Sequence, residues 1–398
     1  MRARRRLVPL LLLPLFLLGV GQARCPHPNV LVIGLDGGTW AVMDPLMQAG
    51  YLPNFARIVA HSARGDLSCT EAFPQFACFC PPVWNSIFTG VTAAEHGIGS
   101  LDQNSTDRRR KPIWSVLHAY GLTTTGLSLR TTWPTEPDMA LDFNEQGLDA
   151  ASREIYERWG DLPDPREAFE QFRTGPPGMF EALGMLPHVG DRVPVWSMFA
   201  RDRVALEALR RVVGVARTDL TFIVLHGPDK IEHLIWSAIQ PIQFGPIDES
   251  ALLDMAARYT GPTVGPPPWA FGSLSAQYQE ADAWLGQFLR RNHYDYIMLV
   301  SDHGMGRRLI GGGLTGDHGL LNPEAHLGIF ALAGPGIHEG PISAPITVLD
   351  VAPTLAYLLG VPIGQDLPGR VIQQAFTARW WLRHRPETVA SWEALPQG

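Results

Sequence analysis

The chain has 398 residues, a formal net charge of −7 and 45% hydrophobic residues. This composition is typical of a globular protein and excludes a disordered chain, while the acidic balance argues against a nucleic-acid-binding protein. The length suits one large α/β domain or two small ones, and the sequence shows no internal repeat.

The N-terminal residues 1–23 are predicted to form a signal peptide. Four arginines among the first six residues precede the apolar run Leu7–Val20, and the small residues of Gly21-Gln22-Ala23 suit cleavage by a signal peptidase. The apolar run is short for a bilayer span, so a retained N-terminal anchor is the alternative. Cleavage removes four arginines, moves the formal charge to −11 and leaves an exported chain, periplasmic or secreted, that begins near Arg24.

Short apolar runs alternate with helical patterns along the rest of the chain. The predicted strands, most of them continuously apolar as buried parallel strands are, are Asn29–Leu35, Leu122–Leu129, Leu220–Leu225, Tyr296–Val300 and Gly328–Leu332. Helical patterns occur at Asp202–Val215, Ser275–Arg291 and Leu349–Leu359. This alternation predicts an α/β protein with a mostly parallel sheet flanked by helices.

Two stretches rich in Pro and Gly, about residues 159–194 and 239–269, interrupt the alternation and lack periodicity. Long irregular segments of this kind usually form lids or substrate loops, so we interpret them as insertions over the active face. We therefore predict one domain over residues 24–376. Residues 377–398 form a C-terminal tail that is expected to dock loosely on it.

Polar residues that directly follow apolar strands are the first candidates for a site, because ligands of parallel sheets bind beyond the carboxyl ends of the strands. Asp36 follows the first strand, and Gly37 and Gly38 leave space beside it. Taken alone, an Asp-Gly pair after a strand is more often a turn.

Two further clusters combine carboxylates with imidazoles. Asp229 and His233 follow the strand that ends at Leu225, and their spacing of four places both on one face of a helix. Asp302-His303 follows the strand that ends at Val300, and His318 comes after a Gly-rich loop. Such side chains suit zinc or a similar divalent ion, although a capping Asp and a surface His would explain each cluster separately. Three clusters at strand ends together indicate a metal site.

In the order of these motifs, the chain resembles the type I phosphodiesterase and nucleotide pyrophosphatase branch of the alkaline phosphatase superfamily. The resemblance rests on Asp36-Gly37, Asp229 with His233, Asp302-His303-Gly304-Met305, and His318-Gly319. It extends through Gly334–Ile337 and the string Asp350–Thr354, and covers nearly the whole mature chain. It implies an alkaline phosphatase-like three-layer sandwich with a mostly parallel central sheet and cap insertions.

The resemblance also implies two divalent metal ions, and the mixture of His and Asp favours zinc. Asp36, Asp302 and His303, together with the nucleophile, would hold one ion. Asp229, His233 and His318 would hold the other. His326 is the other candidate for the last place, but His318-Gly319 stands at about the family's distance before Phe330 and is preferred.

The nucleophile of the family lies ten residues before the glycine of a Thr-Gly pair, and counting back from Thr89-Gly90 gives Cys80. The phosphodiesterase branch has threonine there. The related sulfatases have a cysteine that is converted to formylglycine in a Cys-x-Pro-x-Arg context, but Trp84 stands where the arginine belongs. The conversion signal is therefore incomplete.

An unmodified Cys80 at a helix N-terminus and beside a divalent cation is favoured as a thiolate, which can attack phosphorus or only bind metal. The alternative is a disulfide between Cys80 and Cys69 or Cys78. If Cys80 has a chemical role, Cys69 with Cys78 is the preferred pair.

The sequence thus predicts a metal-dependent hydrolase of small-molecule phosphate esters, either diesters or monoesters, with Cys80 as the catalytic residue. A sulfatase, with calcium in place of zinc, and an inactive metal-binding protein of the same fold are the alternatives. No nucleic-acid partner is expected, and contact with a membrane is expected only through an uncleaved N-terminal segment.

Overall fold

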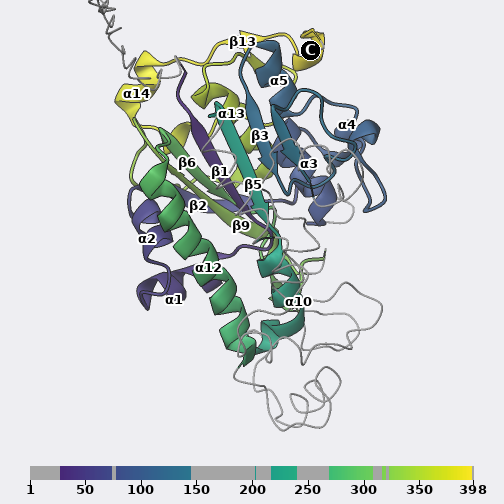
Figure 1. Cartoon of the computed structure of the whole chain (residues 1–398). Helices are drawn as coiled ribbons and strands as arrows, with labels where there is room; N and C mark the ends of the chain where they lie inside the picture. Colours follow the sequence, from purple (N-terminus) through teal and green to yellow (C-terminus); the bar gives the residue numbers. More distant parts are fainter. Residues whose placement is uncertain are drawn as a thin grey trace, which may run out of the picture.

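The structure is a computed structural model that describes residues 27–73, 78–144, 202, 217–239, 269–307, 316–319 and 322–396. Nine strands of these residues form one central sheet (Figure 1). In spatial order they are β10 (Gly340–Pro341), β2 (Ser62–Ser68), β9 (Leu327–Ala333), β6 (Tyr296–Val300), β1 (Val30–Leu35), β5 (Leu220–Leu225), β3 (Thr124–Leu127) and β4 (Leu141–Phe143), with β11 (Ile346–Thr347) beside β2.

The middle of the sheet is parallel. β1 pairs in parallel with β5 on one side and with β6 on the other, and β3 continues the parallel arrangement beyond β5. β9 is the exception, because it runs antiparallel to both β6 and β2. The α/β class with a mixed, mostly parallel sheet is therefore confirmed, and the carboxyl ends of β5, β1 and β6 lie together at one edge.

Helices cover both faces of the sheet and complete three layers. One face carries α3 (Cys80–Thr89), α5 (Ile113–Ala119) and α13 (Val351–Leu358). The other face carries α1 (Trp40–Gln48), α2 (Pro53–Ala60), α10 (Gly227–Ile239) and α12 (Trp269–Arg291). None of the helices in the described residues is both long enough and apolar enough to span a bilayer.

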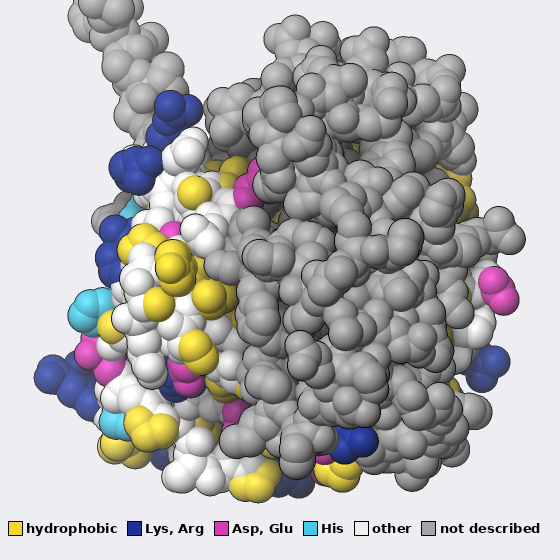
Figure 2. All heavy atoms as spheres, turned by 90° about the horizontal axis from the view of Figure 1, so that it is seen from below, with side chains coloured by type: hydrophobic (Ala, Val, Ile, Leu, Met, Phe, Trp, Pro, Cys, Tyr) yellow, Lys and Arg dark blue, Asp and Glu magenta, His cyan; other side chains and the backbone are white. Residues whose placement is uncertain are grey.

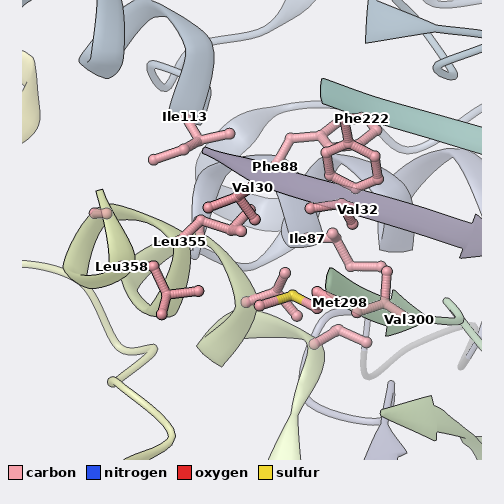
Figure 3. Close-up of a cluster of buried hydrophobic side chains, with 14 of the residues drawn as sticks. Val30, Val32, Ile87, Phe88, Ile113, Phe222, Met298, Val300, Leu355 and Leu358 are labelled. Carbon is pink, nitrogen blue, oxygen red and sulfur yellow. The ribbon is translucent and has the colours of Figure 1, made fainter. Parts of the chain in front are cut away.

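The strands bury side chains on both faces, which explains why their sequences are continuously apolar. Along β1, Val30 and Val32 pack into the core under α3 and α13, while Leu31 and Ile33 point into the core on the opposite face. Figure 3 shows Val30 and Val32 beside Phe88 in the first of these cores.

All five predicted strands are present. Helix α12 begins at Trp269, six residues before the start of the predicted helix Ser275–Arg291. β3 is shorter than predicted and ends at Leu127, because Ser128 takes a positive φ of 57° and leaves the extended conformation. Strand β2 is not among the predicted strands, because its residues Ser62–Ser68 are mostly polar or charged. The predicted helix Asp202–Val215 lies outside the described residues apart from Asp202.

The predicted insertions also lie outside the described residues, apart from Ile239 and Trp269 at the ends of the second. Figure 2 views the molecule from below, and on the described part of that face acidic, basic and hydrophobic side chains are mixed. No single sign of charge dominates the described part of this face.

The C-terminal tail is packed against the domain more closely than expected. Its strand β13 (Thr388–Val389) pairs in parallel with β12 (Ile363–Gly364). Trp392 is buried and donates a hydrogen bond from Nε1 to the Pro362 carbonyl at 2.9 Å. Before them, the short helix α14 (Ala378–Arg383) begins with a side-chain cap from Thr377.

Candidate active site

Four predicted site residues follow the carboxyl ends of three adjacent strands. Asp36 directly follows β1, Asp302 and His303 follow β6, and Asp229 lies in the first turn of α10, which begins after β5. The Asp229 backbone N–H donates to the Asp36 carbonyl at 3.0 Å, so the start of α10 is fixed beside the end of β1. The parallel register of the strands thus brings Asp36 and His303, which are almost 270 positions apart in sequence, to one edge of the sheet.

Gly37 allows this close approach. It has a positive φ of 75°, and a Cβ added to it would lie 2.9 Å from the Asp229 Cα. Its backbone N–H donates to Asp302 Oδ1 at 3.3 Å. A larger residue would clash with the backbone of α10 and would also be strained at this positive φ. Glycine is therefore required here for Asp229 to come close.

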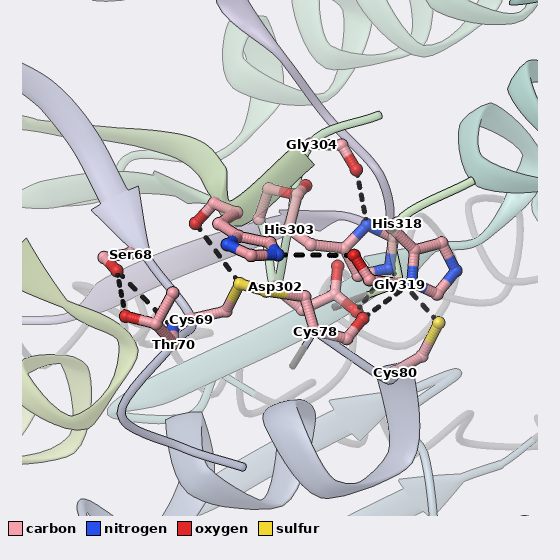
Figure 4. The surroundings of a disulfide bond; sticks show 12 residues. Ser68, Cys69, Thr70, Cys78, Cys80, Asp302, His303, Gly304, His318 and Gly319 are labelled. Atoms are coloured by element: carbon pink, nitrogen blue, oxygen red, sulfur yellow. Dashed lines mark hydrogen bonds and ion pairs between the residues drawn. A yellow bond between two sulfur atoms is a disulfide. The ribbon is translucent and has the colours of Figure 1, made fainter. Parts of the chain in front are cut away.

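Cys80 is the first residue of α3 and reaches the same edge from the other face of the sheet. The helix lies close against β1 because Gly34 has no side chain; a Cβ there would be 2.6 Å from the Trp84 ring. Cys80 Sγ lies 3.3 Å from His303 Nε2 and is buried (Figure 4).

A disulfide joins Cys69 to Cys78, which confirms the preferred pairing. Cys80 is the free cysteine of the described residues, so its pairing with either of the other two is excluded. Cys78 remains close to the site through its backbone, because His318 Nδ1 donates to the Cys78 carbonyl at 2.7 Å.

The seven predicted site residues form two overlapping groups. In the first group, Asp36, Cys80, Asp302 and His303 each offer a ligand atom within 4.8 Å of the others. His303 Nε2 lies 3.6 Å from Asp36 Oδ1 and 3.3 Å from Asp302 Oδ2. This set contains two carboxylates, one imidazole and one thiol.

The second group surrounds Asp229. Its Oδ1 lies 3.7 Å from His318 Nε2 and 3.2 Å from His233 Nε2, and the two imidazole nitrogens are 3.1 Å apart. Cys80 and His303 are within 4.8 Å of the Asp229 and His318 ligand atoms as well, so the two groups share these side chains. The rings of His303 and His318 stack with centroids 3.8 Å apart.

The outer nitrogens of the three histidines all contact backbone carbonyls. His233 Nδ1 faces the Gly316 carbonyl at 3.0 Å, His303 Nδ1 faces the Gly304 carbonyl at 2.7 Å, and His318 Nδ1 faces that of Cys78. Carbonyl oxygens only accept, so each Nδ1 carries the proton and, in a neutral ring, Nε2 presents a lone pair to the centre. Burial lowers the pKa of both His303 and His318 and favours this neutral form, whereas at His233 the contact with Asp229 outweighs burial and raises the pKa.

Each of the three aspartates presents one buried carboxylate oxygen that lacks a hydrogen-bond partner. Asp36 Oδ1, Asp229 Oδ1 and Asp302 Oδ2 are buried and have no hydrogen-bond partner. Burial, together with the charges of Asp36 and Asp229, raises the pKa of Asp302 well above its usual value. Unpaired buried oxygens and converging imidazole lone pairs are destabilising without positive charge, and divalent cations supply that charge. The residues therefore fit a metal centre.

Three cationic or imidazole side chains contact the outer carboxylate oxygens. His226 Nδ1 lies 2.5 Å from Asp36 Oδ2 and its Nε2 donates to the Ser128 carbonyl at 2.8 Å. Arg130 also donates to Asp36 Oδ2, at 3.3 Å, and Lys230 donates to Asp229 Oδ2 at 2.8 Å. Burial alone raises the pKa of Asp36, but the contacts with His226 and Arg130 outweigh it and hold the pKa below its usual range.

The protein's own charges oppose ionisation of Cys80. Burial and the neighbouring Asp36, Asp229 and Asp302 carboxylates raise the pKa of the thiol, and the Lys230 charge acts in the opposite direction without outweighing them. A thiolate at this position therefore depends on further positive charge in the centre.

Three further site residues, which the sequence-based prediction did not include, also lie at or just beyond the ends of strands. His226 directly follows β5 and Lys230 is adjacent to Asp229, so both lie beyond the end of β5; Arg130 follows the shorter β3. His326 lies outside both groups of candidate metal ligands, and its Nε2 contacts the Gly319 carbonyl at 3.3 Å.

Solved structures of several hydrolases share the fold. A 2-O GAG sulfatase superposes with a TM-score of 0.55 at 12% identity, over 87% of this chain and 73% of its own. A putative sulfatase from Bacteroides thetaiotaomicron gives 0.54 at 12% identity, over 87% and 74%. The phosphonate monoester hydrolase of Agrobacterium radiobacter gives 0.50 at 16% identity, over 87% and 76%. At these identities the likeness concerns the fold alone.

No curated protein matches the chain in sequence. Residues 30–308, well over half of the chain, match the model of the family described as type I phosphodiesterase / nucleotide pyrophosphatase. That range contains Asp36, Cys80, Asp229, His233 and Asp302-His303. The chain therefore belongs to the type I phosphodiesterase / nucleotide pyrophosphatase family of the alkaline phosphatase superfamily and is a hydrolase of phosphate esters.

Proposed function

We propose that the protein hydrolyses small-molecule phosphate esters with two divalent cations, and that Cys80 is its nucleophile. The observation that carries this proposal is the convergence of Cys80 Sγ, three buried carboxylate oxygens without hydrogen-bond partners and the Nε2 atoms of His303 and His318. His233 Nε2 lies 3.1 Å from that of His318 and extends this cluster. Asp36, Asp302, His303 and Cys80 would hold one ion. Asp229, His233 and His318 would hold the other, and the donor set favours zinc.

Bound divalent ions supply Lewis acidity and favour the thiolate over the thiol. Cys80 is well placed to use that thiolate, since it begins α3 and points to the edge where the strands end. The partial positive charge of the helix N-terminus favours a negative sulfur, and the Lys230 ammonium acts in the same direction.

In the proposed reaction, the Cys80 sulfur forms a bond to phosphorus while the bond from phosphorus to the leaving oxygen breaks. The leaving oxygen takes a proton from water. A second water then breaks the sulfur–phosphorus bond, which releases the phosphate product and restores the cysteine. Arg130 and Lys230 lie beside Asp36 and Asp229 and can donate to non-bridging oxygens of the substrate, since each has N–H groups beyond the one facing its carboxylate.

A sulfatase is the second candidate, and the observation that favours it is the cysteine itself, which the phosphodiesterase branch replaces by threonine. Trp84, at the position of the arginine in the formylglycine signal, is fully buried and stacks on Phe88. Because Trp84 serves to pack the core, the arginine of the conversion signal has no counterpart here. This supports the proposal that Cys80 stays unmodified.

The test combines activity with the mass of the Cys80 peptide. We expect turnover of an aryl phosphodiester or monoester by the metallated protein, an unmodified cysteine, and loss of turnover in Cys80→Ala with the fold retained. Cys80→Thr is expected to retain part of the activity. A lighter peptide with turnover of an aryl sulfate would instead establish the sulfatase, and absence of any turnover in the metallated wild type would leave only the metal-binding protein.

We also propose that the protein is exported. The disulfide between Cys69 and Cys78 supports this, because such bonds persist in oxidising compartments. N-terminal sequencing of the protein from its native host should begin near Arg24. An intact Met1 on soluble cytoplasmic protein would contradict export.

A further inference from the structure

The C-terminal helix α14 exposes apolar and basic side chains together. Leu382 is 68% exposed, and Trp380 and Trp381 are partly exposed beside it. Arg379 and Arg383 are exposed on the same short helix, and His384 and Arg385 directly after it are exposed as well. We call residues 379–385 the α14 surface.

The aromatic rings of this surface are held in place. Trp381 packs against Tyr357 with ring centroids 5.3 Å apart, and Arg385 lies 6.0 Å from the centre of the Trp381 ring. Trp380 stacks on His384 at 4.0 Å. Because the rings have fixed positions, their contact with a partner costs little conformational entropy.

The α14 surface lies where the N-terminal segment joins the fold. A cavity of about 510 Å³ is lined by His27, the first described residue, together with Trp380 and His384. The apolar run Leu7–Val20 ends only a few residues before His27. The described part of the chain therefore begins beside α14.

This end of the molecule is opposite the candidate active site. The cavity is also lined by Asp295 and Tyr296 at the start of β6, whereas the site follows the carboxyl ends of the strands. Arg290 and Arg291 end α12 near this end and are exposed (Figure 1). A partner bound here would leave the active site accessible.

We propose that the α14 surface docks the protein on an anionic lipid bilayer. Tryptophan rings favour the membrane interface, an exposed leucine can enter the acyl region, and arginines are attracted to anionic headgroups. The described chain begins at this end with His27, and the signal sequence predicted before it would bring this end to a membrane during export, which is the remaining argument for lipid as the occupant. This contact goes beyond the proposed function and does not depend on it.

The test measures fluorescence quenching by brominated lipids, which requires the Trp380 and Trp381 rings to reach the acyl chains. This readout is valid for the N-terminal form that cells produce, cleaved or not, because an N-terminal anchor alone does not bring these rings into the bilayer. We expect quenching with brominated phosphatidylglycerol vesicles, little with phosphatidylcholine, and loss of the signal in Trp380→Phe/Trp381→Phe.

Leu382→Glu should abolish the quenching, and replacement of Arg379, Arg383 and Arg385 by Gln should weaken vesicle binding by about fivefold for each arginine. Tyr51→Glu is the matched control, since Tyr51 is 55% exposed and lies between α1 and α2, away from this surface. All these variants should hydrolyse a soluble ester as the wild type does. Equal quenching with both lipids, or vesicle binding without quenching of these two rings, would overturn the proposal.

Discussion

His318 donates a hydrogen bond from Nδ1 to the backbone carbonyl of Cys78, a residue of the Cys69–Cys78 disulfide. The disulfide thereby fixes the orientation of an imidazole whose Nε2 lies 3.7 Å from Asp229 Oδ1. Two residues after Cys78, the chain reaches Cys80 and begins α3. One covalent bond thus constrains both the start of α3, where the proposed nucleophile lies, and a proposed metal ligand.

Removal of the disulfide should therefore affect both stability and metal binding. A bridge that closes so short a loop contributes about 2 to 3 kcal/mol to the free energy of unfolding. In Cys69→Ala/Cys78→Ala we expect that loss in urea unfolding of the apoprotein, together with weaker zinc binding in titration calorimetry. Unchanged zinc affinity in the double variant would show that the bond acts on stability alone.

The proposed ligands predict the metal content. The wild type should bind close to two divalent ions per chain, measured by elemental analysis after dialysis. His318→Ala should lose one of them, because its Nε2 faces Asp229 and its Nδ1 is already committed to Cys78. His326→Ala is the control, since His326 lies outside the cluster and should keep both ions. Equal metal content in the two variants would refute the assignment of His318.

Those parts of the site that follow buried strands can be predicted from the sequence. Continuous apolar runs mark β1 and β6, and parallel strands bring their ends together, so that Asp36 and Asp302-His303 stand out as candidates. The contact between Cys80 and His303 could be anticipated only through the family resemblance, since nothing local in α3 indicates which strand end it faces.

Other features depend on tertiary contacts that carry no local pattern. β2 is polar for most of its length and becomes a strand through its pairing with β9, so periodicity does not reveal it. The tautomers of His318 and His233 depend on the carbonyls of Cys78 and Gly316, which lie 240 and 83 positions away from them in sequence.

Gly37 provides a test of the packing between β1 and α10. A Cβ at this position would lie 2.9 Å from the Asp229 Cα, so Gly37→Ala should displace Asp229 and lower turnover by at least tenfold. Gly50→Ala is the matched control, because Gly50 has a similar positive φ of 79° but nothing within 4 Å of the added Cβ. Both variants should lose about 1 kcal/mol of stability through backbone strain. Full turnover in Gly37→Ala would mean that α10 can move without loss of function.

The free energy of unfolding should depend on pH through His96, which is buried beneath the first turn of α3. Its Nδ1 accepts from the Ile98 backbone N–H at 3.1 Å, so Nε2 carries the proton and faces the Pro82 carbonyl and Ser86 Oγ, each at 3.1 Å. The neutral ring satisfies these partners, whereas a second proton on Nδ1 would oppose the Ile98 N–H. Burial and the Arg108 charge accordingly lower the pKa of His96 to about 3.

Because the folded-state pKa lies below the unfolded value of about 6.5, the unfolded chain binds the additional proton more readily. The contribution of His96 is therefore fully present above pH 6.5 and is lost as the pH falls toward 3. Between pH 8 and pH 5 the loss amounts to about 2 kcal/mol. His96→Gln removes the titrating ring while keeping an N–H donor for Pro82. In urea unfolding of the apoproteins, the wild type should lose about 2 kcal/mol more than this variant over that interval, and parallel pH profiles would show that His96 is accessible to protons in the folded state.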